Sequence, residues 1–562
     1  MHIRDATDYS IGELFKENTG SSERFQVPPY QRRYSWEKDQ WNDLWEDLTA
    51  LETPQDKHFL GTIVFISGAH KAQGNNLIDV VDGQQRITTI SLLLAAMRDH
   101  YKEADEDYTG YVEGLDKRLW MYGYDGNKTD KLKLELGNLD KKDYFNIIAG
   151  KENEVENDKL LDAYKFYRKK LRNQDTDDIV TLQHHLLENF RYVSVTVEED
   201  GDAYRLFEVL NNRGLELSPV DLIKNHLFYI SFEQDAIDQK RIKTLWTQTI
   251  HNLDGINEVR FFRQYMMSSQ IADIGEKVTK NKLFDHFTDS LDDIEDVEAF
   301  LEDIRDKSKL YRKLYFAEID QFDKNQNEII NRKLKDAKVV SKTIFTALMG
   351  IFDELERPQT ISKAIDILLV MLIRRSITGQ STASLDIWMG HLSKNGFDED
   401  YPSYVEEYIK DEIPDDSTFK EHFAEGKYRN NDLTRYLLVT IEEEHYGQQG
   451  KRVATPYEVH IEHILPETIS KKTSNWLEYA DIDEEEHKTY RKKIGNLTLL
   501  ERSPNIKASN NPYEEKRRHY APEKTEMEMT QRIPTQYSQW KTDQIEKRSK
   551  QLAEIAVEVW SL

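Results

Sequence analysis

The sequence predicts a helix-rich α+β protein that is organised into about three domains. Segments rich in Ile, Val and Phe, typical of strands, occur within the first 200 residues, and helical periodicity dominates from about residue 236 to 440. At 562 residues the chain is too long for a single hydrophobic core, and 38% hydrophobic residues suffice for several. We therefore expect domains at 1–235, 236–440 and 441–562, with a helical insertion at about 100–190 in the first.

The first domain is expected to be mixed α/β. FQVPPYQRRYSW should be extended, because Pro28 and Pro29 disfavour a helix there. HFLGTIVFIS, NLIDVVDG and RYVSVTVEE have the composition of strands. A short amphipathic helix should cover 41–48, and a buried helix should follow from Ile87.

Further helices are expected after this mixed region. DAYRLFEVLNNRG should be a helix that ends at Gly214, and Ser218-Pro219 should begin the next one with an N-cap and an N1 proline. Residues 236–440 show no internal repeat, and their pattern indicates no function by itself.

The net charge of −26 argues at first against a nucleic-acid partner. The charge is unevenly distributed, however. From Lys451 onward the chain holds 19 of the 77 basic and 19 of the 103 acidic residues, so the whole acidic excess lies before that point. A local basic patch in this neutral tail could still bind phosphate.

The absence of cysteine excludes disulfides, thiolate zinc sites and cysteine nucleophiles. The apolar run at 367–373 is far shorter than the roughly 20 residues of a membrane span, and MHIRDATDYS has no signal-peptide core. We expect a cytoplasmic protein with no membrane partner.

The segment IDVVDGQQRITT has the features of an anion site. A strand runs into Asp82 and Gly83, and Gln84, Gln85 and Arg86 open a helix whose N-terminus offers free N–H groups. Arg86 adds a guanidinium that suits phosphate, and the two Gln side chains could read polar edges. The alternative is a capped helix with a surface arginine.

Other segments supply further donors for such a site. YQRRYSW contains Gln31, Arg32 and Tyr34, although core packing is an alternative for its aromatic residues. Asp221 could be a helix cap or take part in chemistry, and there is no P-loop motif. The complete set of candidate nucleotide-binding residues is Gln31, Arg32, Tyr34, Asp82, Gly83, Gln84, Gln85, Arg86, Asn211, Arg213 and Lys224.

Four motifs in this order resemble the N-terminal domain of the GmrSD-type restriction endonucleases, which include the SspE and BrxU defence proteins. They are VPPYQRRYSWEKDQW, FLGTIVF, DVVDGQQRITT and FEVLNNRGLELSPVDLIKN, and they span residues from about 10 to 230. The resemblance implies a ParB/sulfiredoxin-like fold. It also implies binding, and often hydrolysis, of a nucleoside triphosphate (GTP, ATP or another), coupled to recognition of modified DNA.

A second constellation lies near the end of the chain, in HIEHILPE, IGNLTLL and SPNIKAS. Glu462 and His463 are adjacent, Asn496 follows 33 positions after the histidine, and Asn505 lies nine positions further on. An acidic residue beside a His, then an Asn, then a second ligand on a short helix is the layout of a one-metal nuclease. The alternative is a packed histidine with two turn-forming asparagines.

This constellation resembles the HNH, or His-Me finger, nuclease domain found at the C-terminus of the same family, which has a ββα-metal fold. The resemblance implies that His463 is the general base and that Glu462 and Asn505 are ligands. Asn496 would orient His463 or pin the loop through its amide. A carboxylate with an amide favours Mg²⁺ or Mn²⁺ over tight Zn²⁺ binding.

Three basic residues are candidates for DNA phosphate contacts: Lys507, Lys516 and Arg517, with solvated side chains as the alternative. His460 could be a ligand, a phosphate contact or only a strand residue.

The two constellations together predict a modification-dependent DNA endonuclease of bacterial anti-phage defence that is regulated by a nucleotide. Its expected partners are DNA that carries a chemical modification, a nucleotide, and a second copy of the chain in a homodimer. Two alternatives are a nucleotide-switched DNA-binding regulator with a degenerate nuclease site, and an NTPase that depletes nucleotide.

Overall fold

The computed structural model divides the chain into two compact units, each of which is described by itself. Unit 1 comprises Met1–Val259 and Asn281–Ser308, and unit 2 comprises Arg260–Lys280 and Lys309–Leu562. The architecture is helix-rich α+β, as predicted, while the three-part division and the finer fold assignments stay predictions. The residues that the structure describes are 3–17, 23–51, 53, 55–67, 77–104, 106–123, 125–197, 218–233, 238–269, 277–291, 296–397, 400–429, 431–447, 453, 456, 458–469 and 475–562.

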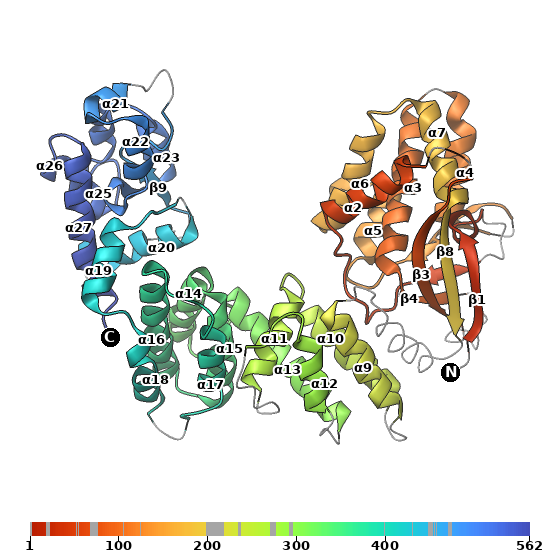
Figure 1. Cartoon of the computed structure of the whole chain (residues 1–562), viewed down its shortest axis with the longest axis horizontal. Helices are drawn as coiled ribbons and strands as arrows, with labels where there is room; N and C mark the ends of the chain where they lie inside the picture. Colours follow the sequence, from red (N-terminus) through yellow and green to blue (C-terminus); the bar gives the residue numbers. More distant parts are fainter. Residues whose placement is uncertain are drawn as a thin grey trace. The chain divides into compact units, whose positions relative to one another are not determined.

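Unit 1 contains a six-stranded mixed sheet, with α2 to α7 beside it (Figure 1). β1 pairs antiparallel with β8, β8 parallel with β3, β3 antiparallel with β4, and β2 lies parallel to both β4 and β7. In sheet order the strands are β1 (Ile3–Ser10), β8 (Phe190–Val197), β3 (His58–Ile66), β4 (Leu77–Asp82), β2 (Arg24–Gln26) and β7 (Leu134–Glu135).

The turn between β4 and α3 (Gln84–Glu103) is made by Gly83, whose φ of 84° is left-handed. Glycine adopts that conformation without steric cost, so the chain can pass directly from strand to helix. α3 is buried along nearly its whole length and packs against α4 (Thr109–Leu119) and α6 (Asp158–Leu171). The predicted strand, tight turn and buried helix are confirmed.

The remaining helices of unit 1 cover this core or follow it. The predicted insertion contains a two-stranded sheet, β5 (Trp120–Tyr122) with β6 (Lys128–Leu132), which the all-helical expectation missed. Trp120 and Leu132 are buried in the core and explain why these short segments pair. The other helices are α1 (Ile11–Leu14), α2 (Lys38–Thr49), α5 (Lys141–Ile148), α7 (Thr176–His184), α9 (Pro219–Glu233), α10 (Gln239–Asn252) and α12 (Leu283–Leu291); α11 (Glu258–Ser268) and α13 (Val297–Phe316) each continue into unit 2.

Unit 2 is helical apart from one short hairpin. β9 (His460–His463) pairs antiparallel with β10 (Leu497–Leu500), and α23 (Arg502–Ala508) follows at once. The helices before the hairpin are α14 (Lys324–Val340), α15 (Phe345–Glu354), α16 (Pro358–Ile377), α17 (Leu385–Leu392), α18 (Tyr401–Ile409), α19 (Asp416–Glu425) and α20 (Asp432–Ile441). The others are α21 (Asn475–Ala480), α22 (Glu484–Tyr490), α24 (Tyr513–Lys516), α25 (Glu528–Gln531), α26 (Ile533–Gln536) and α27 (Thr542–Val559).

Aromatic residues fill the core around the hairpin of unit 2. Trp476, Tyr513, Tyr520 and Trp540 are almost completely buried in one cluster. Packing of this kind can hold a domain that has no disulfides or thiolate metal sites. None of the described helices is both long enough and apolar enough to cross a bilayer.

Candidate functional site

A cavity of about 370 Å³ lies in unit 1 where β4 ends and α3 begins. It gathers eight of the predicted nucleotide-binding residues from three separate segments of the chain, together with Asp221. The other lining residues also lie within the quoted motifs, although none of them was a candidate nucleotide-binding residue. The cavity is lined by Gln31, Arg32, Trp36, Phe59, Leu60, Gly61, Val81, Asp82, Gly83, Gln84, Gln85, Arg86, Asp221, Lys224 and Asn225.

Arg86 is held in the cavity wall by groups of two strands. It donates to the carbonyl of Leu60 at 2.6 Å and lies 3.4 Å from the Asp82 carboxylate. Gly61 has a left-handed φ of 97°, and a Cβ there would collide with the Arg86 guanidinium. Gly61 therefore makes room for Arg86, a role that only the tertiary contact reveals.

A network of paired charges also lines the cavity. Lys224 is buried and donates to the amide oxygen of Gln31, and its Nζ lies 3.7 Å from Asp221. Arg32 Nε lies 3.1 Å from the same carboxylate. Asp221 thus pairs with two cations, which favours a role at the cavity over the helix cap considered from the sequence.

Burial shifts the pKa values of groups at and near this cavity. Desolvation raises the pKa of Asp82 and lowers the pKa of Lys224. Glu258 does not line the cavity, but it interacts electrostatically with Asp221 and Lys224, and its pKa is raised to about 7, first by burial and then by the charge of Asp221. Sequence reasoning missed Glu258, because nothing in its local pattern indicates burial beside another carboxylate.

The two glutamines of DGQQR have different roles. Gln85 accepts from Ser35 N at 2.8 Å and donates to the carbonyl of Arg33 at 3.2 Å, so it holds the QRRYSW segment. Gln84 is about nine-tenths buried, and its Oε1 has no hydrogen-bond partner. Asn225 Oδ1 is likewise buried without a partner. Gln84 and Asn225 therefore leave acceptors for a ligand, whereas Gln85 does not.

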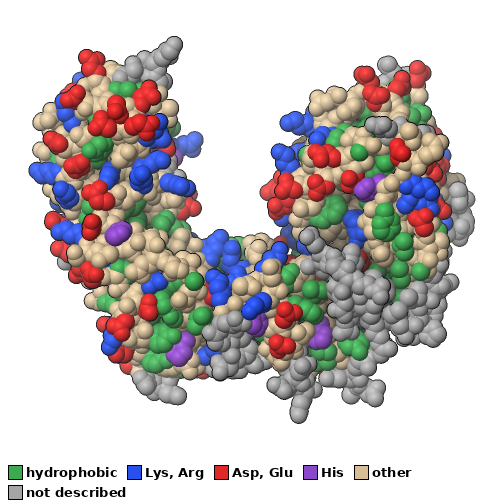
Figure 2. Space-filling model, viewed as in Figure 1, with side chains coloured by type: hydrophobic (Ala, Val, Ile, Leu, Met, Phe, Trp, Pro, Cys, Tyr) green, Lys and Arg blue, Asp and Glu red, His purple; other side chains and the backbone are tan. Residues whose placement is uncertain are grey.

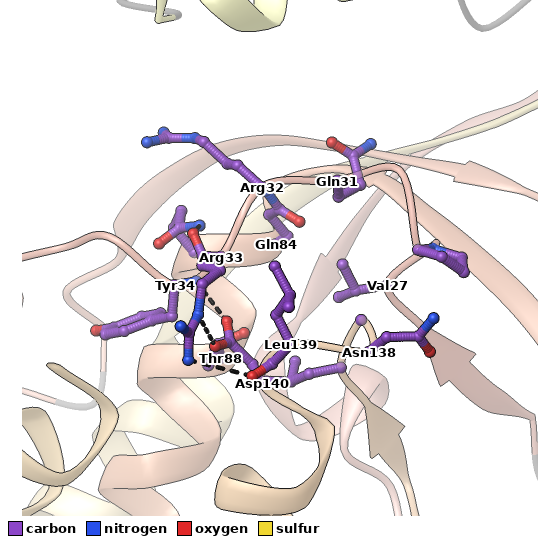
Figure 3. Close-up of a pocket in the computed structure, with 14 residues that line it drawn as sticks. Val27, Gln31, Arg32, Arg33, Tyr34, Gln84, Thr88, Asn138, Leu139 and Asp140 are labelled. Atoms are coloured by element: carbon purple, nitrogen blue, oxygen red, sulfur yellow. Dashed lines mark hydrogen bonds and ion pairs between the residues drawn. The ribbon is translucent and has the colours of Figure 1, made fainter. Parts of the chain in front are cut away.

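Tyr34 does not line this cavity, but it borders a second, smaller pocket together with Gln31, Arg32, Gln84 and Gln85, so its predicted place in the site stays a prediction. Its hydroxyl shares a hydrogen bond of 2.7 Å with Thr89 and accepts from Trp41 at 2.8 Å, so the core-packing alternative holds for it. Figure 3 shows Tyr34 near the paired Arg33 and Asp140, with Arg32 and Gln31 pointing away from that pair.

The predicted residues Asn211 and Arg213 lie outside the described residues.

The second group of predicted site residues lies on and next to the β9–β10 hairpin of unit 2. His463 is paired with Leu497 and Glu462 with Thr498, and α23 packs against β9. Because side chains alternate along a strand, Glu462 and His463 point to opposite faces. The strand–strand–helix order is compatible with the expected ββα fold.

Asn496 pins the loop that follows His463. It is completely buried, and its amide accepts from Leu465 N at 2.7 Å and donates to the carbonyl of the same residue at 2.9 Å. It also accepts from Trp540 Nε1 at 3.1 Å. Of the two predicted roles, the geometry favours loop fixation over a contact with the histidine ring.

Glu462 is paired with an internal cation. Its Oε1 accepts from Lys516 Nζ at 2.7 Å and from the Tyr520 hydroxyl at 2.8 Å, and Lys516 also donates to the His463 carbonyl at 2.6 Å. Lys516 is completely buried, and desolvation lowers its pKa while the Glu462 charge opposes that shift. The predicted contact of Lys516 with DNA phosphate does not fit this position.

The imidazole of His463 is mostly buried and makes no hydrogen bond to another described residue. Desolvation lowers the pKa of His463 to about 4, with Lys516 and Arg491 acting in the same direction and Glu467 against them. The ring is therefore neutral at pH 7, the form that can take up a proton. His460 lies on the same strand, opposite Leu500.

Asn505 offers an unused oxygen on α23. Its Oδ1 is buried and has no hydrogen-bond partner. Lys507 is exposed on the same helix, whereas Arg517 pairs with Glu514 at 3.2 Å and donates to the Pro534 carbonyl.

The donor atoms near the hairpin fit a hard cation. Asn505 Oδ1 and Glu462 Oε2 are oxygens that accept no hydrogen bond from a described residue. No group of three or more His, Cys, Asp or Glu in the described part of the chain could hold a metal. Mg²⁺ is commonly bound through one or two carboxylates and completes its shell with water and substrate phosphate, so a carboxylate and an amide oxygen are ligands of a suitable chemical type for it.

Comparisons with known proteins match both parts of the chain. The model of the GmrSD restriction endonuclease N-terminal domain matches residues 11–228. The model of the GmrSD restriction endonucleases C-terminal domain matches residues 413–555. No curated protein matches the chain in sequence.

Proposed function

This chain belongs to the GmrSD restriction endonuclease family, and we propose that it cuts DNA by metal-assisted hydrolysis under the control of a bound nucleotide. The first unit would bind the nucleotide, and the hairpin of the second would carry out the cut. Membership of the family indicates a restriction endonuclease with DNA as its partner. The metal, the nucleotide and the dependence on modified DNA belong to the proposal.

His463 is proposed to be the general base. Its neutral ring can take a proton from a water molecule that attacks the phosphodiester. Asn496 would act only through position, because it fixes the loop that begins directly after the histidine.

Glu462 Oε2 and Asn505 Oδ1 would hold Mg²⁺ or Mn²⁺. A bound divalent ion would stabilise the negative charge that develops on the leaving oxygen. Lys516 keeps the other oxygen of Glu462 engaged, and so it would limit that carboxylate to a single ligand atom.

The observation that carries the nuclease proposal is the arrangement of the hairpin: His463 and Glu462 are adjacent on β9, which pairs with β10, and Asn505 with its unpartnered Oδ1 lies on the helix that follows. The test is nicking of supercoiled plasmid DNA with Mg²⁺ or with EDTA. His463→Ala should abolish Mg²⁺-dependent nicking, and His422→Ala, which removes an exposed histidine of α19, should not. Equal nicking by both variants would contradict the proposal.

The cavity of unit 1 is proposed to bind a nucleoside triphosphate. Its lining contains three cations, Arg32, Arg86 and Lys224, and the free acceptors of Gln84 and Asn225. Titration with fluorescent GTP and ATP analogues tests this proposal. Lys224→Met should weaken binding of the preferred analogue, while Lys240→Met, at an exposed lysine of α10, should leave it unchanged.

Dependence on a DNA mark is proposed from family membership. A panel of plain, phosphorothioate and glucosylated hydroxymethylcytosine DNAs, each scored for cutting and for stimulated phosphate release, tests it. Equal rates on every member of the panel would exclude modification dependence. A cytoplasmic homodimer in bacterial anti-phage defence completes the proposal.

One observation favours an alternative function. Lys516 already neutralises Glu462, and a regulator whose nuclease site is degenerate would have such an internally satisfied carboxylate. Under this alternative, the protein binds DNA and hydrolyses nucleotide but never nicks. Nicking that is lost in both Glu462→Gln and Asn505→Ala would exclude it.

A further inference from the structure

We propose that the outer face of α23 docks onto duplex DNA, with Ile506 entering the minor groove between phosphate contacts made by Arg502 and Lys507. The inference rests on the proposed nuclease function. It adds to that function a docking surface and an apolar contact residue.

The helical period defines this face. Positions 502, 503, 506 and 507 lie on one side of α23, because successive residues turn by about 100°. All four side chains are exposed, whereas Pro504 and Ala508 on the other side are buried. α23 thus has one packed side, toward β9, and one side open to a partner.

Ile506 is 65% exposed, more than any other large hydrophobic side chain in the described part of the chain. A single exposed apolar residue is ordinary on a protein surface. This one lies between two cations, Arg502 and Lys507, that pair with no carboxylate among the described residues. It also directly follows Asn505, whose buried Oδ1 has no partner.

The chemistry of the face fits a nucleic-acid duplex better than a protein. Each side of a stable protein interface buries about 800 Å², and the surface area of one apolar side chain is only a small part of that. Unpaired Arg and Lys attract phosphates, and Ile is among the side chains that proteins insert between base steps from the minor groove. On the face seen in Figure 2, acidic and basic side chains are mixed in the part that carries α21 to α27.

The exposed face of α23 lies close along the helix to Asn505, the proposed metal ligand. Arg502, Ile506 and Lys507 lie within about one helical turn, 5.4 Å along the axis, of Asn505. A duplex that docks on this face would therefore lie close to Asn505. An apolar insertion there would distort the duplex next to the phosphate that is cut.

The test measures binding of the His463→Ala protein to a fluorescent duplex over a series of salt concentrations. Ile506→Ala should weaken binding about tenfold without changing the salt dependence, because it removes no charge. Arg502→Gln and Lys507→Gln should each lower the slope of log affinity against log salt by about 1. Ile329→Ala, at an exposed isoleucine of α14, is the matched control and should bind normally.

A duplex with 2-aminopurine beside the cut site reports the insertion itself. Its fluorescence should rise when the protein binds, less so with Ile506→Ala, and recover with Ile506→Leu. If Ile506→Ala binds and unstacks the duplex like the parent protein, the inference is wrong, and a changed oligomeric state of that variant would assign the face to a second copy of the chain. Failure of the parent protein to bind plain, phosphorothioate or glucosylated duplex would instead overturn the proposed function, and this inference with it.

Discussion

The cavity of unit 1 and the hairpin site of unit 2 differ in which of their polar side chains are paired with other groups of the protein. In the cavity, Asp221 already pairs with Arg32 and lies close to Lys224, so a ligand phosphate has to compete for those cations. At the hairpin, the charged pair of Lys516 and Glu462 is buried, while the His463 ring and the Asn505 oxygen make no hydrogen bond to another described residue.

The proposed function assigns different roles to the two regions, and their contacts suit those roles. Ion pairs that a ligand must exchange make binding responsive to the charge of that ligand, which suits a regulatory site. Reactive groups held without partners need no rearrangement before they act, which suits catalysis. Substitutions in the two regions should therefore differ in their effects on stability, DNA nicking and nucleotide binding.

The largest effect is expected from Lys516→Met. Removal of this ammonium leaves the Glu462 carboxylate buried without its cation, and breaking a buried pair in this way costs about 3–5 kcal/mol of unfolding free energy. Urea unfolding measures the loss. Lys507→Met, on the exposed face of α23, is the control and should stay within about 0.5 kcal/mol of the parent.

Equal stability of the two lysine variants would show that Lys516 is a surface residue, as the sequence suggested. The double variant Glu462→Gln with Lys516→Met should regain part of the loss, because no buried charge remains.

The case of Lys516 shows what sequence reasoning could reach and what it could not. Local signals predicted the strand, glycine turn and buried helix at 77–103, because periodicity and turn chemistry lie within a few neighbouring residues. The partners of Lys516 lie 53 and 54 positions away, and those of Gln85 lie 50 and 52 away. Burial of this kind is a tertiary property, which no local pattern contains.

The same limit explains why the β5–β6 hairpin was not predicted and why the contacts of Tyr34 were not foreseen. The β5–β6 hairpin lies in a Lys- and Asp-rich segment without regular alternation, and only the packing of Trp120 and Leu132 in the core reveals it. Tyr34 shares its motif with cavity residues, but its side chain points into the core. Local patterns therefore pointed to segments that the fold brings together, whereas the direction of individual side chains depends on tertiary contacts.

Asn496 and Asn505 should separate fixation of the hairpin from chemistry. Asn496→Ala leaves the Leu465 backbone and the Trp540 indole without partners, which should cost about 3 kcal/mol of unfolding free energy. Asn505→Ala removes an oxygen that has no partner, so stability should change by less than about 0.5 kcal/mol.

Plasmid nicking completes the comparison of the two asparagines. Asn505→Ala should lower Mg²⁺-dependent nicking although the protein stays folded. If Asn505→Ala unfolds the protein as readily as Asn496→Ala does, the unpaired oxygen of Asn505 is not the free group that the structure indicates.

His463 should make stability depend on pH. Its pKa is about 4 in the folded chain and about 6.5 when unfolded, so between these values the unfolded chain binds the extra proton and is favoured as pH falls. Between pH 7 and pH 5 the unfolding free energy should therefore fall by about 2 kcal/mol on account of this residue.

His463→Gln should show a smaller loss over the same pH interval in urea unfolding. His422→Gln, at an exposed histidine of α19, should retain the loss of the parent protein. A parent protein whose stability is flat from pH 7 to pH 5 would contradict the buried, neutral state of His463.

The smallest effect concerns the backbone of the cavity in unit 1, and it separates a conformational cost from a binding cost. Gly61 and Gly126 both have left-handed φ, at 97° and 75°, so alanine at either should cost about 1–2 kcal/mol of unfolding free energy. Only at Gly61 would the added Cβ displace Arg86; at Gly126 it meets open space. Gly61→Ala should therefore weaken binding of the fluorescent nucleotide as well, whereas Gly126→Ala should not. Equal nucleotide affinity in the two variants would mean that Arg86 does not touch the ligand, and the cavity would then depend on Arg32 and Lys224 for its positive charge.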